Sequence, residues 1–231
     1  MMRMRALCLL LSTALCGAAS AQGYAKGVNP ADNLTRADVA LGWADVNNES
    51  LTALTVGYEH RLAENWGVGA FLSPLTHFDG DTGTGDFGVG GRYIDTEGDW
   101  RLGASLSAAG STGTLSAIGT GRFRVVPAAL VVRPWTSEDF TAFEAAWVEW
   151  LSNGDDFAIV SLEQGHLFPS GWFVVGDVSY RSFTAQSDGG VGLGFEVGKQ
   201  LNEHWQVALR PGYSFRGSGD PSLYLRAAYF F

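Results

Sequence analysis

The sequence has little cysteine, and both of its cysteines lie in a segment that we expect to be removed. Cys8 and Cys16 belong to the first 21 residues, whose basic start, apolar middle and small-residue end are typical of a secretory signal peptide cut before Gln22. Lipoprotein cleavage at Cys16 is excluded, because the preceding Leu15 is too bulky for it. The mature chain therefore has no thiol, and its fold has to be held by backbone pairing rather than by disulfides.

Basic residues are also scarce, with 15 lysines and arginines against 24 aspartates and glutamates. Two of the 15, Arg3 and Arg5, lie in the predicted signal peptide, so the mature chain carries 13 basic residues and a net charge of −11. This charge excludes nucleic acid as a partner. The 31 glycines are spread along the whole chain and no linker divides it, which indicates one domain of about 210 residues.

A long hydrophobic run is absent as well. No segment after Gln22 approaches the ~20 apolar residues that a membrane helix needs, so any membrane protein here must be a β-barrel. The pattern that is present has a period of two, typical of β-strands with one apolar face. In residues 204–215, for example, Trp205 and Leu209 fall on one face while Gln206 and Arg210 fall on the other.

The alternation predicts about twelve strands, separated by turns that are alternately short and long. Short turns at one rim and long loops at the other are typical of outer-membrane barrels, in which closure leaves no unpaired backbone in hydrocarbon. We therefore expect an all-β, closed, antiparallel transmembrane β-barrel over residues 36–231, preceded by a signal peptide (1–21) and an N-terminal periplasmic segment (22–35). The predicted strands are 36–45, 51–62, 65–72, 86–95, 99–109, 121–134, 139–151, 157–168, 171–183, 190–201, 204–215 and 222–231.

Large aromatic residues recur directly after the short turns. Such residues typically form a girdle at the membrane interface, where an amphipathic ring meets the lipid headgroups. An alternative for each single aromatic is a place in a sandwich core, and the spacing of about 33 residues could indicate a helical repeat, although the period of two argues against that. The predicted girdle consists of Trp66, Trp100, Phe140, Trp172, Trp205 and the terminal Phe231, with Tyr93, Trp135 and Phe168 near the same rim.

The opposite face of the strands carries most of the charged residues and is expected to line the lumen. Seven acidic and eight basic side chains share this face, so they either pair across the barrel or guide a solute, and the sequence leaves both possibilities open. The candidates are Glu59, Arg61, Arg92, Arg101, Arg122, Arg124, Glu144, Glu163, Asp177, Arg181, Glu196, Arg210 and Arg226, together with Asp38 and Asp86. A barrel of this strand number would be about 20 Å across before its side chains are added.

Two motifs were weighed as sites of chemistry, and neither predicts one. The acidic loop "DGDTGTGD" (residues 79–86) lacks the ligand spacing and the closing glutamate of a calcium loop. The stretch "WLSNGDD" is similar to the His-x-Ser-Asn motif of barrel lipid hydrolases, but Trp150 stands in place of the histidine, so Ser152 has no base. We therefore expect no catalytic, cofactor or metal site and no enzyme, with a lipid hydrolase as the weaker alternative.

The last residues, "SLYLRAAYFF", resemble the C-terminal strand through which outer-membrane proteins are recognised by the barrel assembly machinery. The order of "GDFGVGGRYIDTEGDWRLGASLS", "GRFRVVPAALV", "VEWLSNGDD", "FPSGWFVVGDVSY", "GVGLGFEVGKQL" and "VALRPGYSF" is similar to that of transporter-like outer-membrane proteins grouped with the phenol meta-cleavage degradation pathway. This resemblance covers roughly residues 85–231. It implies a barrel that admits small molecules, often aromatic or apolar.

These observations predict a passive channel in the outer membrane of a Gram-negative-type cell. Its expected partners are outer-membrane lipid, the barrel assembly machinery and small solutes, without any cofactor. A closed structural or adhesive barrel is the main alternative, and a soluble secreted β-sandwich is a further one.

Overall fold

A computed structural model describes residues 28–46, 49–95, 97–111, 123–151, 156–182, 189–215 and 220–231. All regular structure in these residues is β, and no helix in them is long and apolar enough to cross a bilayer. The strands are β1 (Arg36–Val46), β2 (Glu49–Arg61), β3 (Trp66–Phe78), β4 (Asp81–Gly83), β5 (Asp86–Ile94), β6 (Arg101–Ser111), β7 (Arg124–Pro134), β8 (Asp139–Trp150), β9 (Phe157–Leu167), β10 (Trp172–Arg181), β11 (Gly190–Gln200), β12 (Trp205–Phe215) and β13 (Asp220–Phe230).

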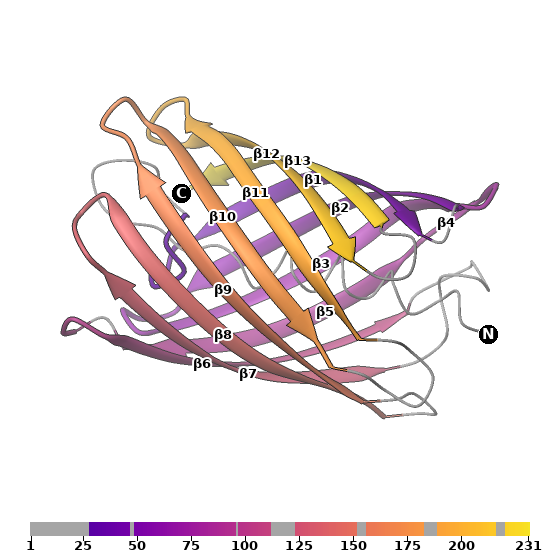
Figure 1. Cartoon of the computed structure of the whole chain (residues 1–231), viewed down its shortest axis with the longest axis horizontal. Helices are drawn as coiled ribbons and strands as arrows, with labels where there is room; N and C mark the ends of the chain where they lie inside the picture. The colour runs from indigo at the N-terminus through magenta and orange to yellow at the C-terminus, as the bar shows by residue number, and fades with distance from the viewer. Residues whose placement is uncertain are drawn as a thin grey trace.

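Twelve of these strands form one closed antiparallel barrel (Figure 1). Each strand pairs with its neighbours in the chain, and β1 closes the ring by pairing with both β2 and β13. Val39, for example, lies opposite Val56 of β2 and Ala227 of β13. The predicted fold class and the number of about 12 strands are therefore confirmed.

The two ends of the barrel differ in their connections. Residues 62–65, 95–100, 135–138, 168–171 and 201–204 join strands at one end, which we call the short-turn end. Both Arg36, the first residue of β1, and the C-terminus lie there, and the backbone nitrogen of Phe231 donates to the carbonyl oxygen of Thr35. The opposite, long-loop end carries the connections 47–48, 112–123, 151–156, 182–189 and 216–219, most of whose residues lie outside the described part of the chain.

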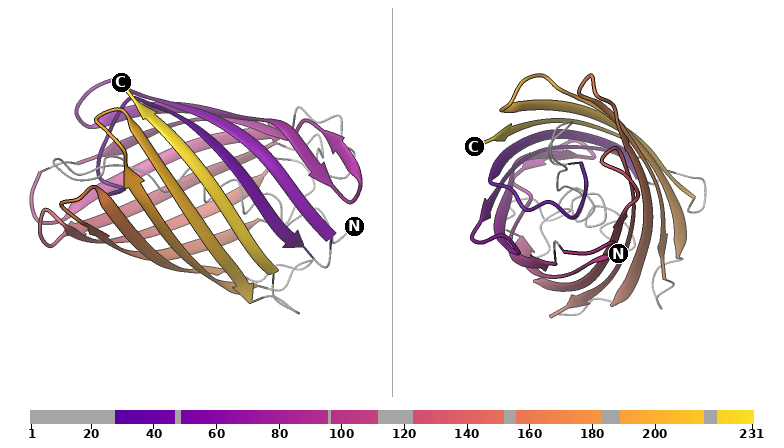
Figure 2. Two further views of the ribbon diagram at one scale, coloured as in Figure 1. Left: turned by 90° about the horizontal axis from the view of Figure 1, so that it is seen from above. Right: turned by 90° about the vertical axis from the view of Figure 1, so that its left-hand side faces the viewer.

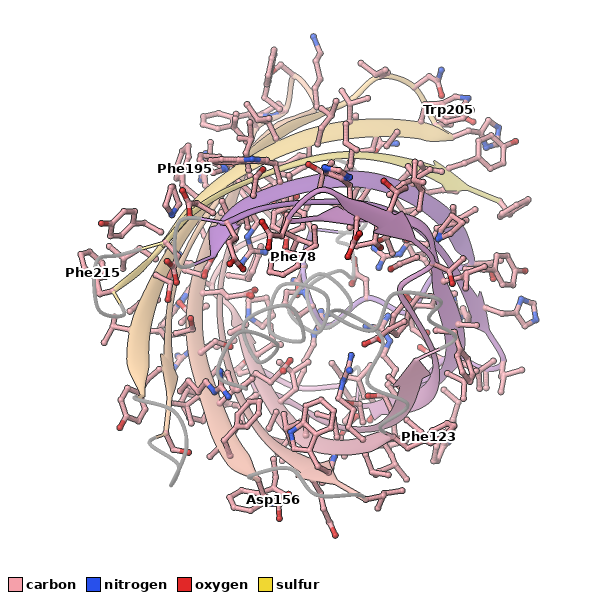
Figure 3. All side chains as sticks on the ribbon, turned by 90° about the vertical axis from the view of Figure 1, so that its right-hand side faces the viewer. Phe78, Phe123, Asp156, Phe195, Trp205 and Phe215 are labelled. Carbon is pink, nitrogen blue, oxygen red and sulfur yellow. The ribbon has the colours of Figure 1, made fainter. Side chains whose placement is uncertain are left out.

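The two faces of the barrel wall have opposite character. On β12, Trp205, Val207 and Leu209 are 47%, 37% and 40% exposed, whereas Gln206 and Ala208 are 1% and 4% exposed. Figure 3 shows the same division, since Phe195, Trp205 and Phe215 project outward while Phe78 projects inward. A soluble sandwich would bury these large apolar side chains. The sandwich and helical-repeat alternatives are therefore wrong.

One boundary differs markedly from the sequence prediction. The strand expected to end at residue 72 continues as β3 to Phe78, and the chain then returns through Asp79 and Gly80 into the short strand β4, which pairs only with β3. Asp79 and Gly80 have φ angles of 48° and 86°. A two-residue turn with both φ angles positive matches the right-handed twist of a hairpin, and Asp-Gly is a preferred sequence for it. This segment was expected to be a flexible acidic loop.

Candidate functional site: the barrel lumen

The lumen is lined on one side by unusually small residues. Strands β3, β5 and β6 turn glycines and serines inward, so the wall leaves space there that bulkier side chains would fill. A cavity follows this wall from Arg36 and Arg92 near the short-turn end to Arg124 and Val126 nearer the long-loop end. Its inward-facing lining includes Gly67, Gly69, Phe71, Gly88, Gly90, Ser105, Ser107, Ala109, Ala128, Leu130 and Glu144.

A second cavity lies under β10–β13 and has a more polar lining. Asp177, Arg210 and Tyr224 border it together with Ser179 and Ser214. The inside of the barrel is therefore asymmetric, because glycine, alanine and apolar side chains make up more of the first wall than of the second.

Near the short-turn end, the inward-facing charges pair with one another. Glu59 Oε1 lies 2.7 Å from Arg92 Nη2, and Glu59 Oε2 lies 3.3 Å from Arg36 Nη2. The same Arg36 places its Nε 3.1 Å from Asp38 Oδ2. Each charge thus has an opposite charge on an adjacent or nearby strand, which offsets the cost of removing it from water.

The pairing continues around the barrel through β13, β12, β11 and β10. Arg226 Nη2 lies 2.8 Å from Glu196 Oε1, and Arg210 Nη2 lies 2.7 Å from Asp177 Oδ1. Longer contacts of 4.0 Å join Arg226 to Asp38 and Arg210 to Glu196. Arg101 also lies 3.7 Å from Asp32, a residue that precedes β1. We call all these residues the lumenal ion network: Asp32, Arg36, Asp38, Glu59, Arg92, Arg101, Asp177, Glu196, Arg210 and Arg226.

Residues 28–35 lie inside the short-turn end of the barrel, and we call them the N-terminal plug (Figure 2). They belong to the segment 22–35 that was expected on the periplasmic side. Val28 and Ala31 are buried in an apolar cluster at the inner face of the wall. The other buried members of this cluster are Ile94, Val132, Phe140, Ala142, Leu167, Phe173 and Ala208, which come from six strands.

Polar contacts fix the plug at its other side. Arg92 Nη2 donates to the carbonyl oxygen of Asp32 at 2.5 Å, and Arg101 Nη1 lies 3.7 Å from Asp32 Oδ1. Asn33 Nδ2 donates to the carbonyl oxygen of Ala63 in a short turn at 3.1 Å. The plug therefore narrows the lumen at this end and is joined to the lumenal ion network.

Two further arginines lie toward the long-loop end. Arg124 Nη1 lies 2.7 Å from Asp86 Oδ2, and its Cζ lies 5.7 Å from the ring centroid of Trp150. Arg181 lies with its Cζ 3.7 Å from the ring centroid of Phe157. Val126, Val148 and Phe157 form a second inward-facing apolar cluster, so Phe157 belongs both to this cluster and to the contact with Arg181.

The remaining lumen candidates are spread along the barrel. Glu144 lines the small-residue cavity, and Glu163 lies opposite Asp177 in the pairing of β9 with β10. Arg61 is exposed at the short-turn rim, where its Nε donates to the carbonyl oxygen of Ala63. Arg122 lies outside the described residues.

Two members of the network were missed at the sequence level. Arg36 shares its face of β1 with Asp38, so the period of two was sufficient to find it. Asp32 precedes the first strand and has no periodicity to place it.

The aromatic residues after the short turns follow the prediction in their exposure, with one exception. Trp66, Trp100, Trp172, Trp205 and Phe231 are all exposed. Phe140 is only 1% exposed and packs in the cluster that holds the plug, so its assignment to the outer girdle is wrong. The physical reason is parity, because Phe140 and Glu144 stand four residues apart on one strand and must share a face.

The hydrolase motif is only partly covered by the structure. Ser152 lies outside the described residues, and Trp150 faces the lumen beside Arg124. His166 lies on the outer face of β9, where its Nδ1 is 2.7 Å from Asp139 Oδ1. In the described residues, no group of three or more histidine, cysteine or carboxylate side chains could hold a metal ion.

No known protein family and no curated protein matches the sequence. Solved structures do match the fold. An outer membrane channel from Pseudomonas putida F1 has a TM-score of 0.67 at 13% identity, with 86% of this chain and 96% of that chain covered. The KdgM porin has a TM-score of 0.65 at 11% identity, covering 85% and 99%. The CymD monoaromatic hydrocarbon channel has a TM-score of 0.56 at 10% identity, covering 86% and 89%. At such identities the likeness concerns the fold.

Proposed function

We propose that the chain is an outer-membrane channel through which small molecules, aromatic or apolar, diffuse passively. The single observation that carries this proposal is the cavity along the inner wall of β1–β8, in which glycine, alanine, serine, valine, leucine and phenylalanine outnumber six charged residues, Arg36, Asp38, Glu59, Arg92, Arg124 and Glu144. Five of the six charges lie in ion pairs, so the small side chains leave space for a solute beside charges that are already compensated. The short-turn end faces the periplasm in this proposal, as is usual for outer-membrane barrels.

The lumenal ion network supports a preference for uncharged solutes. Its arginines and carboxylates lie 2.7–4.0 Å from one another, so their charges are largely compensated within the wall. A charged solute would have to compete with these pairs, while an uncharged one would not. The network is therefore better suited to stabilising the wall than to attracting an ion.

The structural neighbours agree with a channel role. Three of them are described as a porin, an outer membrane channel and a monoaromatic hydrocarbon channel. The grouping with the phenol meta-cleavage degradation pathway, which the sequence resemblance implies, would fit aromatic solutes and is part of this proposal.

A closed barrel is the second candidate, and the N-terminal plug is the observation that favours it. Val28 and Ala31 pack in the short-turn end against side chains from six strands. If the plug stays in place, it closes the lumen, and the barrel would then serve structure, or adhesion through its long-loop end.

The two candidates are separated by permeation through proteoliposomes. We would measure the entry of phenol, benzoate and glucose into liposomes that contain the folded protein, and the single-channel current in planar bilayers. The channel proposal expects phenol to enter fastest and benzoate more slowly. No permeation of any solute and no current, with the protein fully folded, would reject the channel in favour of the closed barrel.

A further inference from the structure

A cation on the outer face of the barrel lies between two aromatic rings at the short-turn end. Arg133 is the last outward-facing residue of β7, and its Cζ lies 4.0 Å from the ring centroid of Trp135 and 4.8 Å from that of Trp100. Trp135 Nε1 donates to Thr141 Oγ1 at 2.8 Å, which fixes the orientation of this ring. The guanidinium is therefore held in place by cation–π contacts rather than by a carboxylate.

The outer face differs here from the lumen. Inside the barrel, the arginines of the network each lie within 4.0 Å of a carboxylate. Across the part of the chain that the structure describes, Arg133 forms no ion pair. A guanidinium carries five N–H donors, and a cation–π contact does not require them as hydrogen-bond donors. These are suited to an anion with several oxygens.

An apolar surface begins directly beside this cation, at the next outward-facing residue of β7 toward the middle of the barrel. Leu102 of β6, Val131 of β7, Phe143 of β8 and Leu162 of β9 lie side by side in the strand pairing and form one outward-facing row. Leu102, Phe143 and Leu162 are exposed. The patch thus combines a cation at the rim with a hydrocarbon-like strip that runs away from it.

We propose that Arg133, Trp100 and Trp135 bind the phosphate of a glycerophospholipid, whose acyl chains lie along Leu102, Val131 and Phe143. The charge of Arg133 complements the phosphodiester, and the apolar row complements the chains, in the order in which one lipid molecule presents them. A two-fold contact with a second copy through this patch would bring the two Arg133 side chains toward each other, so the patch favours lipid as its occupant. The proposal depends on an outer-membrane barrel but not on transport.

Native mass spectrometry of the folded protein in detergent would test this site. We would titrate the protein with a short-chain phosphatidylethanolamine, with the diacylglycerol of the same chains, and with inorganic phosphate. The wild-type chain is expected to retain phospholipid but neither of the other two probes. Arg133→Gln is expected to weaken phospholipid retention by about tenfold, as loss of a charge-assisted hydrogen bond would.

Arg61→Gln is the matched control, because Arg61 is also an exposed arginine at the short-turn rim but has no aromatic ring stacked on it in the described residues. It should retain phospholipid as the wild type does. If Arg133→Gln fails to fold, Trp100→Leu replaces it and should weaken retention several-fold while keeping the charge. The proposal is overturned if the folded variants retain phospholipid equally, if diacylglycerol binds as well as phospholipid, or if inorganic phosphate alone is retained.

Discussion

Arg92 joins the N-terminal plug to the barrel wall through Asp32. Its Nη2 atom donates to the carbonyl oxygen of Asp32 at 2.5 Å and also lies 2.7 Å from Glu59 Oε1 of β2. One guanidinium therefore holds the position of the plug and compensates a carboxylate of the wall. Any change that removes the plug also changes the surroundings of the lumenal ion network, so the two features have to be tested separately.

Placing a charge in the apolar contact of the plug should release it. Ala31 is fully buried in the cluster with Ile94 and Phe140, so in Ala31→Glu a carboxylate would be buried there without a partner. We expect the plug to leave the lumen and the single-channel conductance in planar bilayers to rise. Ala63→Glu makes the same substitution in an exposed short turn at the same end and should leave conductance unchanged. Equal conductance in both folded variants would show that the plug does not limit the current.

Removing the shared carboxylate of the network should destabilise the barrel. Glu59 compensates both Arg36 and Arg92, so Glu59→Gln leaves two largely buried cations with less negative charge around them. We expect the free energy of unfolding to fall by about 1–3 kcal/mol. Urea titration of the protein in lipid vesicles would measure it. Glu97→Gln, in an exposed turn, should change it by less than about 0.5 kcal/mol, and a similar loss in both variants would contradict the structural role of the network.

The number of strands, and the side of the wall to which each side chain points, could be predicted because the barrel imposes a simple alternation on the sequence. One face meets an apolar environment and the other meets the lumen, so the period of two is visible along nearly every strand. The placement of Phe140 failed because its position after a short turn was given more weight than its parity with Glu144. The hairpin β3–β4 was missed because Asp79-Gly80 was considered as an acidic metal loop and not as turn chemistry.

The plug could not be predicted from sequence for a different reason. Its residues have no periodicity, and its contacts come from side chains on β5, β7, β8, β9, β10 and β12 that are far apart in the chain. Each of these residues, such as Ala208 or Val132, fits the alternating strand pattern whether or not a plug is present. Only closure of the barrel brings them to the same height along its axis, where together they contact Val28 and Ala31.

The ring of Phe140 leaves no room for a side chain at position 165. The two residues lie opposite each other in the pairing of β8 with β9, and a Cβ atom at Gly165 would overlap the ring of Phe140. Gly165→Ala should therefore lower the free energy of unfolding by about 1–3 kcal/mol. Gly176→Ala is the matched control, because a Cβ there meets no atom within 4 Å. The same urea titration would compare them, and an unchanged stability in Gly165→Ala would show that the ring can move aside at no cost.

Two consecutive alanines on β7 test whether solutes use the small-residue cavity. Ala128 faces this cavity, whereas its neighbour Ala129 is exposed on the outer face. Tryptophan at position 128 would fill space in the lumen, so Ala128→Trp should reduce both single-channel conductance and the entry of phenol into proteoliposomes several-fold. Ala129→Trp adds the same ring to a surface that already carries large apolar residues and should leave both rates unchanged. If the two folded variants admit phenol equally, the solute does not pass along this wall, and the polar cavity under β10–β13 becomes the route to examine.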